Sequence, residues 1–289
     1  MTEEQSIAPK RTLFKLIILF VLFISLIFIY AVYVGPNGLR IKEYRIESSI
    51  LSENFNGIKI VHFSDLLFRN TDDKDIITNL VDNINKLKPD LVFFTGDLIN
   101  SDTKITSDNL EFLVSKLKEI DVTIAKYYIY GDFDYSFDGY EELMNECGFI
   151  LLNNSYDEIY YKSNDPLYVV GLPSSIKTAT KLDEAFEFYS DEDRKYIITL
   201  VHDGKTIKSI DNSDYEVDLI LGGHSLNGNV VIPYVGGLFI DDNCYKYYKP
   251  EYEKGITKIF ISSGLGTNKY RFRMFNKPSF NLYRLKAQS

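Results

Sequence analysis

The chain has 289 residues, of which 45% are hydrophobic and 25% charged, so it can build a full core and is not disordered. Its net charge of −9 argues against nucleic acid as the main partner, because phosphate contacts need a surplus of lysine and arginine. The two cysteines, Cys147 and Cys244, follow no CxxC pattern and require no disulfide.

The first feature along the chain is an apolar run over residues 16–34, which follows a short polar tail over residues 1–15. A helix of this length spans about 28 Å, close to the thickness of the hydrocarbon core of a bilayer. The run therefore predicts a transmembrane anchor. A cleaved signal peptide is the alternative, but residues 35–38 offer no A-x-A-like cleavage site.

Basic residues flank this run on both sides: Lys10, Arg11 and Lys15 before it, and Arg40, Lys42 and Arg45 after it. Those nearest the hydrocarbon precede the run, which favours a cytoplasmic N-terminus. We therefore expect a single-pass protein of the cell membrane with an extracellular domain. Residues 35–56 are expected to form a linker and lead-in, and residues 57–289 the domain.

From residue 57 the chain alternates strand patterns with helix patterns. Strands are predicted over residues 57–63, 91–95 and 124–130, and amphipathic helices over residues 72–88 and 107–120. This βαβαβ order predicts a parallel sheet and places the fold in the α/β class.

Beyond residue 148 the pattern becomes richer in strands. We expect strands within 150–170, a helix over 182–188, strands over 196–201 and 218–221, and a β-rich remainder over 230–285. His62, which lies inside the first strand, is predicted to be a core histidine with a satisfied hydrogen bond.

Residues that can bind metals stand directly after five of the predicted strands. They are Asp65, Asp97, Asp132 (followed by Asp134), His202 and His224. In an open α/β sheet the carboxyl ends of the strands are where ligands bind. Carboxylates and imidazoles are ligands for Mn, Fe or Zn, so the pattern indicates a metal site, although Gly-Asp after a strand is also an ordinary turn signal.

The ordered set SDLL, TGDL, GDFD, VHD and GGHSLNG resembles the calcineurin-like metallophosphoesterase superfamily. The ending ISSGLGTNKYRFRMFNKPSF is similar to the RGLGT…R…PE ending of its membrane-anchored bacterial branch. The resemblance covers about residues 57–285. It implies a four-layer α/β/β/α sandwich with two metals at the sheet edge and hydrolysis of phosphate esters.

The chain departs from the family pattern at three positions. The family motifs DxH, GD, GNH[DE], a lone His and GHxH call for five histidines, whereas this chain has three, one of which precedes the first motif. Leucines stand at positions 67 and 226, where the resemblance implies ligands of the first metal. Phe133 replaces the histidine that the family places beside the leaving group. Asp134 is expected to be a turn-former or a relic that once oriented that histidine.

The second metal keeps a complete ligand set by the same resemblance. Asp97, Asp132 in place of the family's Asn, His202 and His224 can all coordinate, and Asp65 belongs to the first metal. We expect one divalent metal (Mn, Fe or Zn) or none, and both alternatives stay open. Losing an oxyanion-type stabiliser typically lowers a rate by about 100- to 1,000-fold, so ordinary turnover is not expected.

The leading hypothesis is a membrane-anchored metallophosphoesterase-like protein with a degenerate site, a pseudoenzyme that acts as a binding or regulatory partner of another membrane or envelope protein. The alternative is a single-metal phosphoesterase that acts on a lipid-linked or envelope phosphate ester. A third alternative is a purely structural anchored domain whose pocket has no role.

Overall fold

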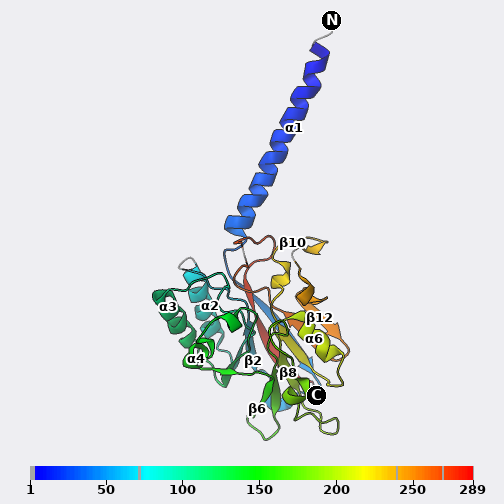
Figure 1. Cartoon of the computed structure of the whole chain (residues 1–289). Helices are drawn as coiled ribbons and strands as arrows, with labels where there is room; N and C mark the ends of the chain where they lie inside the picture. The colour runs from blue at the N-terminus through cyan, green and yellow to red at the C-terminus, as the bar shows by residue number, and fades with distance from the viewer. Residues whose placement is uncertain (1–3, 71–72, 239, 269, 289) are drawn as a thin grey trace.

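The computed structural model describes residues 4–70, 73–238, 240–268 and 270–288. It begins with a long helix, α1 (Glu4–Ile29), which continues into a π-helical turn, η1 (Tyr30–Val34). This helix stands away from the rest of the molecule (Figure 1). Residues 11–34 have a mean hydropathy of 3.0 at their most apolar and are almost wholly exposed. By length and composition, α1 with η1 could cross a membrane or serve as a signal sequence.

The first of two six-stranded sheets has the order β1-β14-β2-β3-β4-β5. Its strands are β1 (Arg40–Ser48), β2 (Lys59–Phe63), β3 (Leu91–Phe94), β4 (Ala125–Tyr128), β5 (Phe149–Leu151) and β14 (Ser279–Ala287). Strands β2 to β5 are parallel, as the βαβαβ order predicts, and β14 is antiparallel to β2. Each of the three predicted strands in this region lies within a residue or two of its observed bounds.

The second sheet has the order β12-β13-β9-β8-β7-β6. Its strands are β6 (Ser155–Ile159), β7 (Leu167–Gly171), β8 (Ile197–Leu200), β9 (Leu219–Gly222), β12 (Glu251–Lys254) and β13 (Thr257–Ile261). The four central strands are parallel and the two edge strands antiparallel. A separate small hairpin of β10 (Val231–Ile232) and β11 (Gly236–Gly237) follows β9 in the chain and lies near the base of α1 (Figure 1).

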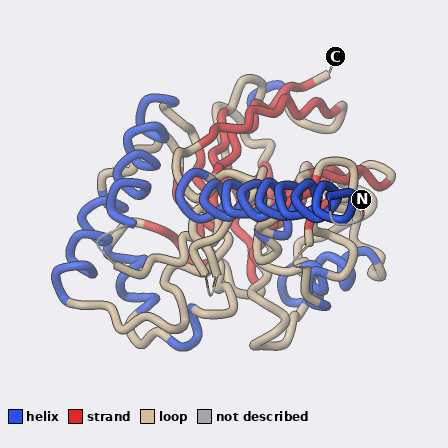
Figure 2. The backbone as a smooth tube through the Cα atoms, turned by 90° about the horizontal axis from the view of Figure 1, so that it is seen from above, coloured by secondary structure: helices blue, strands red, loops and turns tan. Residues whose placement is uncertain are grey.

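Helices flank the strands on both sides (Figure 2). The helices are α2 (Lys74–Leu87), α3 (Ser107–Lys118), α4 (Tyr140–Glu146), α5 (Leu182–Ala185) and α6 (Gly204–Asp211). Three apolar cores separate four layers: the first three helices against the first sheet, sheet against sheet, and the second sheet against α5 and α6. The α/β/β/α sandwich expected from the resemblance is therefore confirmed. Residue 72, the expected start of the helix that became α2, lies outside the described residues.

One strand was not predicted. Residues 40–48, expected to be part of a linker, form β1 and pair in parallel with β14 over nine residues, so the domain begins before residue 57. The signal was weak because five of these nine residues, in the sequence RIKEYRIES, are charged and only Ile46 is buried. The helix expected over residues 182–188 is also shorter and ends at Ala185.

Candidate metal centre

The polar residues that follow the strands of both sheets converge at one edge of the sandwich. Donor atoms of Asp132, His202 and His224 lie within 4.8 Å of one another, and so do those of Asp65, Asp97 and His202. These two groups share His202, so the five predicted residues form one cluster. A cavity of about 190 Å³ opens beside it, and its lining includes Asp65, Leu67, Asp97, Asp132, Phe133, His224, Leu226 and Asp241.

The backbone turns sharply at several of these positions. Asp65, Asp97 and His224 adopt φ angles of 51°, 62° and 62°, in the left-handed region that residues other than glycine rarely occupy. Such conformations cost free energy and persist where the surrounding structure imposes them, often at functional sites. Here they turn the chain immediately after a buried strand and direct the side chain into the cluster.

His202 is held through one ring nitrogen and leaves the other available. Its Nδ1 donates a hydrogen bond of 2.7 Å to the carbonyl oxygen of Thr95, which fixes the tautomer with Nε2 unprotonated when the ring is neutral. Nε2 is fully buried and has no hydrogen-bond partner among the described residues. It lies 3.4 Å from Asp97 Oδ2 and 3.9 Å from Asp132 Oδ2. A buried ring nitrogen that faces two carboxylates is suited to a cation, which would take the place of its proton.

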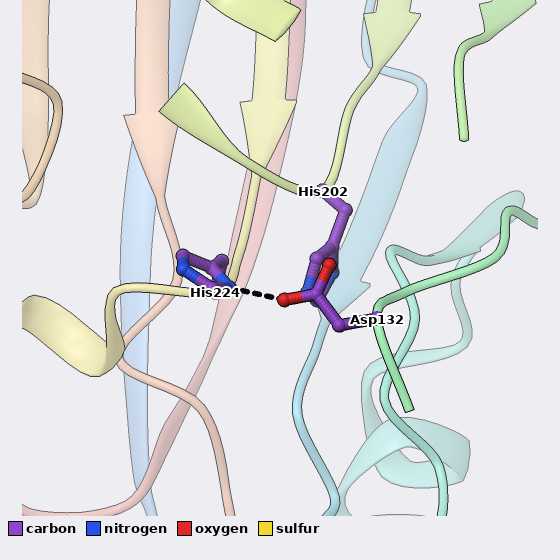
Figure 3. A group of neighbouring side chains, drawn as sticks. All are labelled: Asp132, His202 and His224. Carbon is purple, nitrogen blue, oxygen red and sulfur yellow. Dashed lines mark ion pairs between the residues drawn. The ribbon is translucent and has the colours of Figure 1, made fainter. Parts of the chain in front are cut away.

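His224 contacts a carboxylate at each ring nitrogen. Its Nδ1 is 2.9 Å from Asp132 Oδ2, the contact drawn in Figure 3, and its Nε2 is 2.9 Å from Asp241 Oδ2. Figure 3 also shows that the rings of His202 and His224 approach the Asp132 carboxylate from different segments of the chain. Asp241 therefore orients His224 from outside the cluster, as carboxylates do behind metal-bound histidines.

Backbone and hydroxyl donors fix the three carboxylates of the cluster. The amide of Phe133 donates to Asp97 Oδ1 at 2.8 Å, and the amide of His224 donates to Asp65 Oδ2 at 3.2 Å. The hydroxyl of Ser174 donates to Asp132 Oδ1. Asp97 and Asp132 thus keep their Oδ2 atoms directed toward the histidines.

Asp134 acts on the backbone and not on the cavity. Its buried carboxylate accepts hydrogen bonds from the amides of Asp97, Leu98 and Gly131 at 2.8, 2.9 and 2.8 Å. It therefore stabilises the turns that carry Asp97 and Asp132. Burial, followed by the charge of Asp97, raises the pKa of Asp134 to about 7. Of the two roles expected for Asp134, its contacts are those of a turn-former.

Opposite charges balance this acidic cluster. Burial alone would lower the pKa of His202, but the charges of Asp97 and Asp132 outweigh it and raise that pKa well above its usual value. Burial would also lower the pKa of His224, but its contacts with Asp132 and Asp241 raise that pKa well above its usual value. Burial raises the pKa of Asp65 to about 6. The cluster therefore holds imidazolium and carboxylate together, and a cation would replace the two protons.

Three donors fit one divalent cation, because those of Asp132, His202 and His224 lie within 4.8 Å of one another. Asp97 Oδ2 lies 3.4 Å from the shared His202 Nε2 and can extend this set from a fourth strand end. At the neighbouring position, the buried side chains of Leu67 and Leu226 line the cavity beside Asp65 and Asp97 and offer no ligand atom.

Both leucines have a backbone conformation that residues other than glycine rarely adopt. Their φ angles are 47° and 48°, in the left-handed region. The side chain of Leu226 leaves no room for a Cβ at Gly264, and the Leu66 carbonyl with the Leu67 Cβ leaves none at Gly266. The two leucines are thus packed into the site and do not turn away from it.

Sequence reasoning missed Asp241 and Ser174. Asp241 lies just before η6 (Asp242–Cys244), and Ser174 lies in the loop after β7. Neither follows the residue pattern of a motif, and both act through a residue far away in the chain. His62, in contrast, is the core histidine that its strand position predicts: its Nε2 lies 2.9 Å from Thr95 Oγ1.

Comparison with known proteins agrees with this geometry. The family model for calcineurin-like phosphoesterases matches residues 58–228. The chain is similar to an uncharacterised metallophosphoesterase, YkuE, of Bacillus subtilis, with 28% identity over 261 residues and 89% coverage of each chain. It is also similar to an uncharacterised metallophosphoesterase of Aquifex aeolicus, with 25% identity, 86% coverage of this chain and 93% of the relative.

A further relative is a transmembrane protein with a metallophosphoesterase domain from Danio rerio, with 21% identity over 91% of this chain and 60% of that protein. Among solved structures, a dimetal phosphatase from Danio rerio aligns with a TM-score of 0.46 and 10% identity, covering 73% of this chain and 88% of the other. The family model spans more than half of the chain. The chain therefore belongs to the calcineurin-like phosphoesterase family.

Proposed function

We propose that this protein is a membrane-anchored member of the family that binds a phosphate ester at a single divalent cation and acts as a binding or regulatory partner at the cell envelope, with little or no turnover. The observation that carries this proposal is the contrast between two adjacent positions. One position has His202 Nε2 facing the carboxylates of Asp97 and Asp132, with His224 on the far side of Asp132, and the other has Leu67 and Leu226. We also propose that the N-terminus is cytoplasmic and the domain extracellular.

The family uses divalent metals, and the residues that would hold one here are Asp97, Asp132, His202 and His224. A single bound cation would polarise a phosphate oxygen and lower the pKa of a water ligand. The carbonyl of Thr95 and the carboxylate of Asp241 would keep the two imidazoles in the coordinating orientation. These contacts support binding.

The cavity lacks two features that hydrolysis in this family needs. Two cations about 3.5–4 Å apart normally clamp the phosphate and activate the nucleophile together. Leucines at positions 67 and 226 oppose a second cation, and Phe133 cannot donate a proton to a leaving group. Binding without ordinary turnover is the function that this combination supports best.

The decisive experiment measures metal content and hydrolysis on the same preparation of the full chain. We expect about one equivalent of Mn²⁺ or Zn²⁺, which His202→Ala removes. Cys244→Ser is the matched control, because Cys244 brings a third donor to the neighbouring pair His224 and Asp241. Metal lost equally in Cys244→Ser would place the ion in that neighbouring group and contradict the proposed ligand set.

Hydrolysis of bis-p-nitrophenyl phosphate with Mn²⁺ then separates binding from catalysis. We expect no hydrolysis above the metal-only background. Robust turnover that disappears in Asp97→Ala would overturn the proposal in favour of a second candidate, a single-metal phosphoesterase that acts on a lipid-linked or envelope phosphate ester. The observation that favours this candidate is that all four ligands of one cation and their hydrogen-bond partners are present.

A further inference from the structure

An apolar groove of about 760 Å³ lies between the end of the N-terminal helix and the loop residues 268 and 270–272. It is about four times the size of the cavity beside the metal centre. Its apolar lining comes from Phe28, Val32, Leu226, Tyr270 and Phe272. Polar residues, among them His224, Asp241 and Asn268, also line it. The lining of the groove therefore combines apolar and polar side chains.

The polar end of the groove is continuous with the metal centre. Four residues line both the groove and the smaller cavity: His224, Leu226, Asp241 and Asn268. Leu226 stands where the family resemblance implies a metal ligand, so a leucine here extends the apolar wall up to the neighbouring cation position. The leucine that stands at an expected ligand position therefore also lengthens the apolar surface.

The other end of the groove belongs to the segment that is apolar enough to cross a membrane. Phe28 and Val32 lie within residues 11–34, and the Phe28 ring is 6.2 Å from that of Phe272. The amide of Arg273 donates a hydrogen bond of 2.9 Å to the carbonyl of Ala31, which ties the loop to the helix. The groove thus opens where the helix would leave the hydrocarbon.

Exposed apolar side chains surround this end of the domain. Tyr234 and Val235, at the tip of the β10–β11 hairpin, are fully and 71% exposed, and Tyr270 is 72% exposed. Figure 1 places this hairpin near the base of α1. Exposed aromatic residues beside the end of a membrane-spanning helix are typical of the boundary between a bilayer and water. These side chains would face the lipid headgroups and interface if α1 spans the membrane.

We infer that the groove binds a lipid with a phosphate ester headgroup, with one acyl chain along Phe28, Val32 and Phe272 and the phosphate at the cation. This inference rests on the proposed function, because the cation is what would attract the phosphate to an acidic cluster. Arg271, whose Nη2 is 3.1 Å from Asn37 Oδ1, lines the groove and adds a positive charge. The apolar wall would then bind the acyl chain of the lipid, and the metal centre would bind its headgroup.

The experiment measures binding to the Mn²⁺-loaded full chain in amphipol, so that no detergent competes for the groove. The probes are dioctanoyl phosphatidic acid below its micellar concentration, glycerol 3-phosphate as the headgroup alone, and dioctanoylglycerol as the chains alone. We expect the phosphatidic acid to bind at least about 100-fold more tightly than either, because each buried methylene adds to affinity. Equal affinity of phosphatidic acid and either fragment would overturn the inference.

A matched pair of variants locates the binding site. Val32→Trp fills the groove, whereas Val34→Trp adds the same bulk two residues further along, where the side chain is exposed and does not line the groove. We expect the first to weaken phosphatidic acid binding at least about tenfold and the second to leave it unchanged. An unaffected Val32→Trp would refute the assignment, and Phe272→Gln serves if that variant does not fold.

Metal content distinguishes this inference from the proposed function. Both tryptophan variants should bind Mn²⁺ like the wild type, because neither changes a residue that offers a ligand atom. A wild-type chain without bound Mn²⁺ would contradict the proposed function itself. A loaded chain that fails to prefer phosphatidic acid would contradict only the lipid assignment.

Discussion

Asp241 contacts His224 on the ring nitrogen opposite the one that faces Asp132, and both contacts measure 2.9 Å. The imidazole therefore lies between a carboxylate of the proposed cation site and one outside it. Such an outer carboxylate fixes the orientation of a metal-binding ring and increases its basicity. Asp241 is thus a positioning residue, although no motif in the sequence indicates it.

Replacing Asp241 by alanine should weaken metal binding without abolishing it. We expect Mn²⁺ affinity to fall by about 10- to 100-fold while the stoichiometry at saturation stays the same. A competition titration with a metal-sensitive dye measures both. Asp242→Ala, which removes the adjacent exposed carboxylate, is the control and should change neither.

Restoring histidines at positions 67 and 226 should create a second cation site. Both positions have the left-handed φ angles that Asp65 and Asp97 also have, and both line the same cavity. We expect Leu67→His combined with Leu226→His to raise bound Mn²⁺ from about one to about two equivalents, measured by elemental analysis. The corresponding double glutamine variant controls for polarity. A histidine variant that still binds one ion would show that these positions do not face a shared site.

His62 should make the protein less stable in mild acid. Burial lowers the pKa of His62 from 6.5 to about 3. Between pH 6.5 and pH 3 the imidazole is therefore protonated in the unfolded chain but neutral in the folded chain. The contribution of His62 to the free energy of unfolding therefore falls as pH drops from 6.5 toward 3, by up to about 1.4 kcal/mol per pH unit.

Urea denaturation at several pH values, compared between the wild type and His62→Gln, isolates this contribution. Glutamine can still donate to Thr95 but does not titrate, so the variant should show a shallower pH dependence over this window. Parallel curves for the two proteins would contradict the assignment of His62 as a neutral core residue.

Removing the carboxylate of Asp134 should destabilise the turns that support the site. Asp134→Ala leaves three buried amides without an acceptor, and we expect a loss of about 3 kcal/mol or more in the free energy of unfolding. Thermal or urea unfolding measures the loss. Asp138→Ala, at an exposed position a few residues later, should be nearly neutral. A small effect of Asp134→Ala would mean that water replaces the carboxylate.

A methyl group at Gly35 should disturb the junction between helix and domain. A Cβ there would lie 1.7 Å from the carbonyl oxygen of Arg273, so the loop or the helix must move. We expect Gly35→Ala to increase protease cleavage between helix and domain, with Val34→Ala, which shortens an exposed side chain beside it, as the control. Unchanged cleavage would indicate that the junction adapts at little cost.

The sequence predicts the helices and strands whose apolar residues recur at a regular spacing, and the site residues that directly follow a strand. Runs such as residues 91–95 are apolar throughout because both faces of the strand are buried, and Asp97 then follows at the sheet edge. Strand β1 was not predicted because most of its residues are charged, so it lacks the run of apolar residues by which a buried strand is recognised. Asp241 and Ser174 escaped because only the tertiary fold brings a loop residue next to a distant ligand.

The position of β14 constrains how the chain can be assembled during synthesis. This late strand lies between β1 and β2, the two earliest strands of the first sheet. When the ribosome has made only the early strands, β1 lacks its one neighbour in the sheet. The first sheet can therefore be completed only after residues 279–287 have been made, and until then β1 and the facing edge of β2 lack a strand partner.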